Sequence, residues 1–224
     1  YNGSSWSGGG NVSTARCYLA GAGTQTAGLA FAGYDADNYS KVTCTEEYNG
    51  ATWSTAGVGN LSQSRYKLAG AGTQNSAVAF GGDTSYNATE EYNGASWSGG
   101  GNLSTPRYGL AGSGTSISAV LAFGGYDDDT YTITNATEEY DGTNWSTRPN
   151  LITARCTSGG AGTQSSALAF GGYDGSDCLS STEEYNSSST VLKRGSKTQF
   201  DYSNSTGKTM IIPPTTDPAV VGAL

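Results

Sequence analysis

The stretch Thr89-Glu90-Glu91-Tyr92-Asn93-Gly94-Ala95-Ser96-Trp97 decides the fold, because versions of it recur along the 224-residue chain. The word Thr-Glu-Glu-Tyr begins at residues 45, 89, 137 and 182, and its tyrosines are 44, 48 and 45 residues apart. A tryptophan follows the tyrosine by five residues in three copies, and Tyr1 and Trp6 show the same spacing. Such regularity indicates one structural unit repeated in tandem.

The composition excludes several classes of fold and chemistry. With 34 Gly and only 13% charged residues, the chain lacks the Leu, Glu, Lys and Arg that long helices need. It has no histidine, which removes Ser-His-Asp and Cys-His catalysis and histidine-ligated metals. A net charge of −8 argues against binding to a phosphate backbone. We therefore expect neither an enzyme nor a nucleic-acid-binding protein.

Each copy is expected to form four short strands. In the third copy the first strand runs over residues 107–112, starting at the repeat arginine. The second strand alternates small and large side chains, as in residues 77–80, which is typical of a strand with one bulky face. It ends at a Gly-Gly pair. The Thr-Glu-Glu-Tyr word is the third strand, and an Asn-Gly or Asp-Gly hairpin leads to a fourth strand that carries the tryptophan.

Units of about 40–50 residues with four strands are typical of β-propeller blades. The pattern resembles the kelch repeat, in which an arginine opens strand one, Gly-Gly closes strand two, and a tyrosine and a tryptophan follow. The third copy matches at Arg107, Gly124-Gly125, Tyr140 and Trp145, whereas the first has Ala32-Gly33 in place of Gly-Gly. The resemblance covers residues 1–185 and implies an all-β propeller. The repeats are highly uniform in sequence, and in this they are similar to kelch-like repeats of bacteriophage virion proteins.

We expect four blades, with the ring closed by the N-terminal strand around Trp6. The fourth copy has no tryptophan after Tyr185, and the N-terminal segment supplies a fourth strand with no blade before it. Joining the two removes both exposed sheet edges. The alternative is a larger propeller in which Tyr1 ends an upstream blade, and the Asn2-Gly3 turn favours it.

Residues 186–224 differ in composition from the rest. They carry four Lys or Arg and two Asp, a net charge of +2, whereas residues 1–185 carry −10. Pro213-Pro214 and Asp217-Pro218 favour an extended chain. We expect an extended tail or linker that contacts other virion proteins or a second copy.

The repeat arginines are expected to have a structural role. Neighbouring residues of a strand point to opposite faces, so the two glutamates of each word do not converge as catalytic carboxylates do. One glutamate of each pair is expected to meet an arginine in a buried ion pair. The arginines are Arg16, Arg65, Arg107 and Arg155.

The loops after the second strands combine acids with tyrosines and are expected on one face. Carboxylates suit calcium, but the spacing matches no calcium-binding loop, so no metal and no cofactor is predicted. Solvated acidic turns are one interpretation. Glycan binding is the other, because aromatic rings stack on sugars while Asp and Asn bond their hydroxyls. The candidate ligand residues are Tyr34, Asp35, Asp37, Asp83, Tyr126, Asp127, Asp128, Asp129, Tyr173, Asp174 and Asp177.

The four cysteines occur only in the first and fourth copies, two in each. We expect disulfides Cys17–Cys44 and Cys156–Cys178 within each copy. The loop after strand two must fold inward for this, because strands one and three are two spacings apart. Such bridges would imply an oxidising, extracellular setting. The alternative is four reduced, packed thiols.

The sequence thus predicts a non-enzymatic propeller on a virion surface, as a phage fibre or decoration protein that contacts host glycans. A secreted bacterial adhesion or carbohydrate-binding module is the alternative. No membrane insertion is expected, because the apolar segment 219–224 is far shorter than the ~20 residues of a membrane span.

Overall fold

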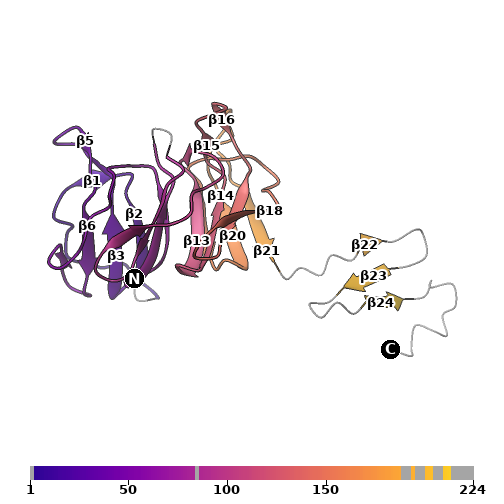
Figure 1. The fold of residues 1–224 in the computed structure, drawn as a ribbon, viewed down its shortest axis with the longest axis horizontal. Coiled ribbons are helices and arrows are strands. Elements are labelled where there is room, and N and C mark those ends of the chain that lie inside the picture. The colour runs from indigo at the N-terminus through magenta and orange to yellow at the C-terminus, as the bar shows by residue number, and fades with distance from the viewer. Residues whose placement is uncertain (1–2, 84–85, 188–192, 195–199, 204–208, 213–224) are drawn as a thin grey trace. The chain divides into compact units, whose positions relative to one another are not determined.

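The computed structural model describes residues 3–83 and 86–187 in full, together with the backbone of residues 193–194, 200–203 and 209–212. The fold is all-β (Figure 1). The chain divides into two compact units, Tyr1–Tyr185 and Asn186–Leu224. Within the described residues there is no helix with the length and apolar character to cross a membrane.

Unit 1 contains four main sheets, one per sequence copy, which we call repeat sheets 1–4. In each, strands that follow one another in the copy lie side by side. Sheet 1 holds β2 (Ala20–Thr24), β3 (Ala27–Phe31), β6 (Thr45–Tyr48) and β7 (Trp53–Ser54); sheet 2 holds β8 (Ala69–Thr73), β9 (Ser76–Phe80), β10 (Thr89–Tyr92) and β11 (Trp97–Gly99); sheet 3 holds β13 (Ala111–Ser116), β14 (Ala119–Phe123), β17 (Thr137–Tyr140) and β18 (Trp145–Arg148); sheet 4 holds β19 (Gly159–Gly162), β20 (Ser166–Phe170) and β21 (Thr182–Asn186). The first strands of the four repeat sheets, β2, β8, β13 and β19, together line one open pocket of about 180 Å3.

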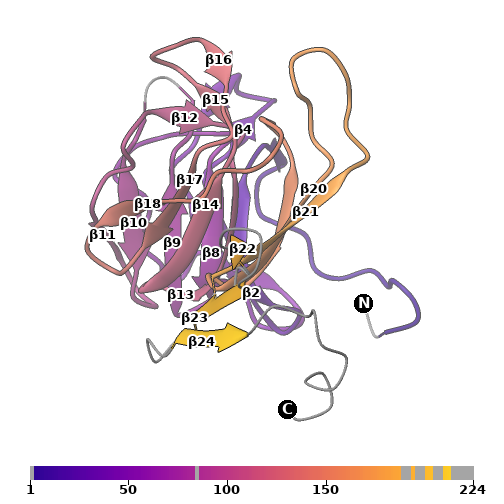
Figure 2. The same cartoon turned by 90° about the vertical axis from the view of Figure 1, so that its right-hand side faces the viewer.

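Two smaller sheets lie at one end of the main sheets, at the upper edge of Figures 1 and 2. One joins β1 (Arg16–Cys17), β4 (Tyr34–Asp35) and β5 (Ser40–Lys41), and the other joins β12 (Arg107–Tyr108), β15 (Tyr126–Asp127) and β16 (Thr132–Ile133).

In unit 2 the structure describes three strands, β22 (Lys193–Arg194), β23 (Phe200–Ser203) and β24 (Thr209–Ile212), which form an antiparallel sheet. The tail expected to be extended therefore includes paired strands. The two proline dipeptides behind that expectation lie outside the described residues.

The expected first strand is broken in two. Arg107–Tyr108 pairs with β15 in a small sheet, and the inner strand β13 begins only at Ala111. The break falls at Gly109, whose φ is +59°, and Tyr18, Lys67 and Thr157 occupy the same place with φ of +54°, +54° and +52°. A left-handed residue ends the first strand and redirects the chain into the repeat sheet.

The Asn-Gly turns differ in detail from the expected two-residue hairpin. Tyr92 pairs with Trp97, so four residues make the turn, and of these Gly94 has a positive φ, +92°. The side chain of Asn93 accepts hydrogen bonds from the backbone N–H groups of Ala95 and Ser96. Asparagine is therefore used for its side-chain oxygen.

Neighbouring repeat sheets pack a bulky face against a face of small residues. Leu29 and Phe31 of sheet 1 lie against Ala77 and Ala79 of sheet 2, and all four are buried. The next two interfaces repeat the arrangement. The expected large-and-small alternation of the second strand is confirmed, and its bulky face is the interface between copies.

Trp97 completes the first of these interfaces. Its ring centroid lies 4.9 Å from that of Phe31, and its indole N–H donates to Thr45 Oγ1 at 2.9 Å. Trp145 makes the equivalent contacts with Phe80 and Thr89. The repeated tryptophan therefore locks its own sheet to the preceding one.

A buried arginine ties each copy together. Arg65 Nη2 donates to Glu90 Oε1 at 2.9 Å, while Nη1 donates to the carbonyl oxygens of Gly81 and Ala88. The second oxygen of Glu90 accepts from the backbone N–H of Ser62. The equivalent ion pairs are Arg16–Glu46, Arg107–Glu138 and Arg155–Glu183. Burial lowers the pKa of Arg65 and Arg107, and the paired glutamates oppose that shift.

The second glutamate of the word faces the other way, as expected for a strand. Glu47 accepts a hydrogen bond from the Tyr92 hydroxyl of the next sheet at 2.8 Å, and Glu91 accepts one from Tyr140 at 2.6 Å. Burial is the main cause that raises the pKa of Tyr92 and Tyr140, and the hydrogen bonds to the glutamates add to it. The two carboxylates of Glu46 and Glu47, and likewise those of Glu90 and Glu91, therefore point to opposite faces of their strand and do not converge as an acid–base pair does.

The predicted disulfides are absent, since all four cysteines are free thiols. Cys156 and Cys178 both pair with Tyr173, one on each side, so two strand spacings of about 4.8 Å separate them, beyond the reach of a disulfide. Cys44 Sγ instead accepts a hydrogen bond from the Arg16 side chain. Cys17 follows Arg16 in β1, so its side chain lies on the opposite face of that strand from Arg16 and Cys44.

The expected N-terminal closing strand is not formed in this structure. No strand occurs among residues 3–15, and sheet 4 has three strands. Leu168 and Phe170, which continue the bulky face in sheet 4, are 40% and 43% exposed.

The close packing between sheets 1 and 2 predicts that position 70 accepts only glycine without a loss of stability. A Cβ there would lie 2.5 Å from Phe31 Cζ, so Gly70→Ala should destabilise the fold by about 1–3 kcal/mol through overpacking. Urea unfolding measures the difference. Gly99→Ala is the matched control, because nothing lies within 4 Å of its Cβ position. Equal stability of the two variants would contradict the interface described.

The buried ion pairs predict an unequal response of two arginines. Arg65→Ala leaves Glu90 buried without its cation and should cost about 3–5 kcal/mol. Arg148→Ala removes an ion pair with Glu139 whose arginine side chain is 38% exposed, and should cost less than about 1 kcal/mol. Chemical denaturation gives the free energy of unfolding of both variants. A similar decrease in the two would show that the buried ion pair stabilises the fold no more than the exposed one.

Candidate functional site

Five tyrosines and one lysine gather at the end of unit 1 that carries the small sheets. This tyrosine face consists of Tyr18, Tyr34, Tyr66, Lys67, Tyr108 and Tyr126. Tyr66 lies 5.9 Å from Tyr18 and 5.6 Å from Tyr34 between ring centroids. Tyr108 and Tyr126, paired across β12 and β15, are 5.1 Å apart. The rings therefore come from three successive copies.

Lys67 lies at the centre of the tyrosine face. Its Nζ is 5.4 Å from the ring centroids of both Tyr18 and Tyr66 and 5.2 Å from that of Tyr108. These distances are within the range of cation–π attraction. The ammonium group of Lys67 thus contacts tyrosines of all three copies.

The backbone explains why these side chains converge. Residues 18, 67 and 109 occupy the left-handed position that ends the first strand of their copies. The N–H of Lys67 donates to the carbonyl of Tyr18, that of Gly109 to Lys67, and that of Thr157 to Gly109. Successive copies are therefore joined at the position from which Tyr18 and Lys67 project.

The tyrosine face is accessible. Tyr18 is 58% exposed, and the other four tyrosines are half-buried. Burial, helped by the neighbouring Tyr126 and Asp128, raises the pKa of Tyr108. Its phenol therefore stays protonated and can donate a hydrogen bond. The face offers flat apolar rings with hydroxyl and ammonium donors at their edges.

The first acid of each predicted loop has a structural task. Asp127 Oδ1 accepts hydrogen bonds from the N–H groups of Asp129 and Thr130. Asp35 and Asp174 cap their loops in the same way. The pKa of Asp35 is lowered chiefly by a further hydrogen bond from the Asn38 side chain and then by the backbone N–H groups, and the pKa of Asp174 is lowered by its backbone hydrogen bonds. These carboxylates shape the turns.

Asp83 joins two copies. Its Oδ1 accepts from the N–H of Tyr66, and its Oδ2 lies 3.1 Å from Lys41 Nζ of the preceding copy. It is 7% exposed. Asp83 therefore holds the backbone at Tyr66, one of the residues of the tyrosine face.

Of the predicted ligand residues, Tyr34 and Tyr126 lie in the tyrosine face. Asp37, Asp129 and Asp177 are exposed, and Asp128 is half-buried. Tyr173 donates its hydroxyl to Gly175 within its own loop. Across the described residues, no group of three or more His, Cys, Asp or Glu side chains is placed to hold a metal ion.

Sequence reasoning missed Tyr18, Tyr66, Lys67 and Tyr108. A signal was present, because Tyr66 and Tyr108 directly follow the repeat arginine. Their convergence depends on left-handed residues and on contacts between copies, which no local pattern reveals.

A scan against models of known protein families and a search of curated proteins each found no match to this chain.

The loop analysis predicts different roles for two neighbouring acids. Asp127→Ala removes the acceptor of two backbone N–H groups and should lower the free energy of unfolding by about 1–2 kcal/mol. Asp129→Ala removes an exposed carboxylate and should leave it within about 0.5 kcal/mol. Thermal and urea denaturation compare them. A destabilising Asp129→Ala with a neutral Asp127→Ala would reverse the assignment.

Proposed function

We propose that residues 1–185 form a four-bladed, kelch-like β-propeller that acts as a non-enzymatic carbohydrate-binding module and holds glycans on the tyrosine face. The observation that carries the proposal is the set of tyrosine rings around Lys67, with Nζ 5.2–5.4 Å from three of them. Aromatic rings stack on the C–H faces of sugars, and few but well-placed polar groups orient them.

The rest of the face fits the same chemistry. Phenol hydroxyls and the Lys67 ammonium supply donors for sugar hydroxyls, and the exposed Asp37 and Asp129 lie on the loops beside Tyr34 and Tyr126. In the turns that follow Tyr34 and Tyr126 the first aspartate accepts hydrogen bonds from the turn backbone, which favours one conformation of these turns before a ligand binds.

For the setting, we propose the surface of a bacteriophage particle, as a fibre or decoration protein that adheres to host glycans. The support is the resemblance of the uniform repeat to kelch-like repeats of virion proteins. Unit 2, with its opposite net charge, is the proposed contact with other virion proteins or with a second copy. A secreted bacterial carbohydrate-binding protein would use the same face.

Binding to an array of bacterial surface polysaccharides tests the proposal. Tyr66→Ala and Lys67→Ala should weaken retention of the bound glycan about tenfold or more, since each removes stacking or donor contacts. Tyr131→Ala is the control, because Tyr131 is 76% exposed and lies on the loop between β15 and β16.

Unchanged binding in both face variants, or binding to no glycan, would reject the carbohydrate site. Co-purification with capsid or tail proteins supports the phage setting. Recovery in a bacterial surface fraction would replace it with the secreted alternative and leave the binding proposal intact.

A further inference from the structure

Lys67 forms no ion pair with any carboxylate of the described residues, although acids are plentiful there. Residues 3–187 contain seven Lys or Arg and seventeen Asp or Glu. Six of the seven cations pair with an acid, namely Arg16, Lys41, Arg65, Arg107, Arg148 and Arg155. The Nζ of Lys67 lies instead beside three tyrosine rings. In this part of the chain, the cation without an anion is therefore the one at the centre of the tyrosine face.

The fold does not need the charge of Lys67. The same left-handed position holds Tyr18, Gly109 and Thr157 in the other copies. Gly109 donates its N–H to the carbonyl of Lys67 just as Lys67 donates to that of Tyr18. The backbone link between copies thus forms at a residue with no side chain at all. Glycine would also adopt the φ of +54° found at Lys67 with less strain.

The acids that border the tyrosine face are engaged in other contacts. Asp83 Oδ2 lies 3.1 Å from Lys41 Nζ. Asp35 and Asp127 each accept hydrogen bonds from the backbone of their own turn. These carboxylates hold the loops in place and leave the Lys67 ammonium without a negative partner.

A carboxylate on a ligand would supply that partner. Tyrosine rings attract an ammonium group through their faces, but they carry no net charge, and a hydrogen bond between two charged groups is stronger. The ammonium of Lys67 has three N–H donors for such a bond. Tyr108, whose ring centroid is 5.2 Å from Nζ, keeps its phenol protonated because burial raises its pKa. Its hydroxyl is a second donor beside the ammonium.

The rings beside Lys67 suit a sugar that carries its carboxylate close to the ring. Tyr18 is 58% exposed, and its ring centroid is 5.4 Å from Nζ. A uronic acid has its carboxylate bonded directly to the pyranose ring. One such sugar can therefore stack on an exposed tyrosine while its carboxylate reaches the ammonium next to it.

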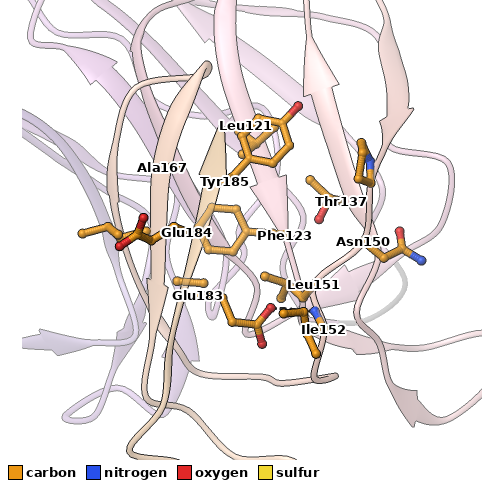
Figure 3. Close-up of a pocket in the computed structure, with 13 residues that line it drawn as sticks. Leu121, Phe123, Thr137, Asn150, Leu151, Ile152, Ala167, Glu183, Glu184 and Tyr185 are labelled. Atoms are coloured by element: carbon orange, nitrogen blue, oxygen red, sulfur yellow. Dashed lines mark hydrogen bonds between the residues drawn. The ribbon is translucent and has the colours of Figure 1, made fainter. Parts of the chain in front are cut away.

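The two hollows of unit 1 offer no comparable cation. The cavity of about 90 Å3 beside sheet 4 is lined by Glu183 and Glu184 together with apolar and neutral residues (Figure 3). The open pocket of about 180 Å3 between the first strands is lined by Gly, Ala and Ser. Neither lining contains a Lys or Arg, so a carboxylate gains a positive partner at the tyrosine face and in neither hollow.

We propose that the glycan held on the tyrosine face is acidic, with a carboxylated sugar whose carboxylate binds the Lys67 ammonium while its ring stacks on the neighbouring tyrosines. This inference rests on the proposed carbohydrate binding and names the class of sugar. The charge of Lys67 then decides which glycans are bound, and the tyrosines supply contacts that neutral and acidic sugars share.

Retention of matched acidic and neutral polysaccharides by the full chain tests the class of sugar. The acidic probes are polygalacturonate, alginate and polysialate, and the neutral probes are their carboxyl-reduced forms, which keep the sugar rings without the charge. The wild type should retain at least one acidic form about tenfold or more better than its reduced form.

Two variants with the same net charge locate the contact. Lys67→Met keeps an unbranched side chain without the ammonium, and should bring the ratio between acidic and reduced forms to about one. Arg148→Met removes a positive charge from an ion pair outside the tyrosine face and should leave the ratio unchanged. Melting curves verify that both variants are folded, and the wild-type ratio decides even if a variant is not.

Equal retention of acidic and reduced forms by the wild type would overturn the acidic class. If Tyr66→Ala then loses both forms, the carbohydrate site stands and only the charge is rejected. A preference that survives in Lys67→Met would remove Lys67 from recognition. Retention of dextran sulfate or of neutral glycans, but of no carboxylated probe, would also contradict the proposal. Retention of no glycan at all would reject the binding site itself.

Discussion

The buried pair of arginine and glutamate is the constraint on which the rest of unit 1 depends. A buried guanidinium must balance its charge within the protein, and in each copy its two Nη atoms bond one carboxylate and at least two backbone carbonyls. Those carbonyls end the second strand and precede the third. The pair therefore fixes the chain reversal around the double glycine. Because the carboxylate also accepts a backbone N–H from the incoming crossover segment, each copy is anchored to the chain that precedes it.

This anchoring sets the direction in which the copies pack. With one glutamate turned inward, the other points to the opposite face of its sheet, and in the first and second copies it accepts a hydrogen bond from the tyrosine hydroxyl of the next sheet. The bulky second-strand residues share that direction and meet alanines, and the tryptophan seals the outer edge. Every interface is therefore directional, bulky face to small face. A directional interface repeated along a chain must leave two unlike, complementary faces at its ends.

The tyrosine face follows from the same repeat. The arginine is held inside, so the next residue of its strand points outward, and in the second and third copies that residue is a tyrosine. The following residue takes a left-handed conformation and joins its neighbour by a backbone hydrogen bond. The backbone hydrogen bonds that join successive copies thus also bring these aromatic side chains together. Lys67 makes the cluster polar at its centre.

The repeat, the all-β class, the bulky face of the second strand and the partner of each arginine could all be predicted from the sequence, because each depends on strand alternation or on spacing within one copy. Of the site, Tyr34 and Tyr126 could be predicted because each stands beside an aspartate in the segment that follows the second strand. The disulfides were wrongly predicted, since sequence pairing by copy ignores the strand that lies between Cys156 and Cys178. Tyr18, Tyr66, Lys67 and Tyr108 were recognised only in the tertiary structure. Their approach depends on positive φ angles and on hydrogen bonds between copies, and these exist only once neighbouring sheets are packed.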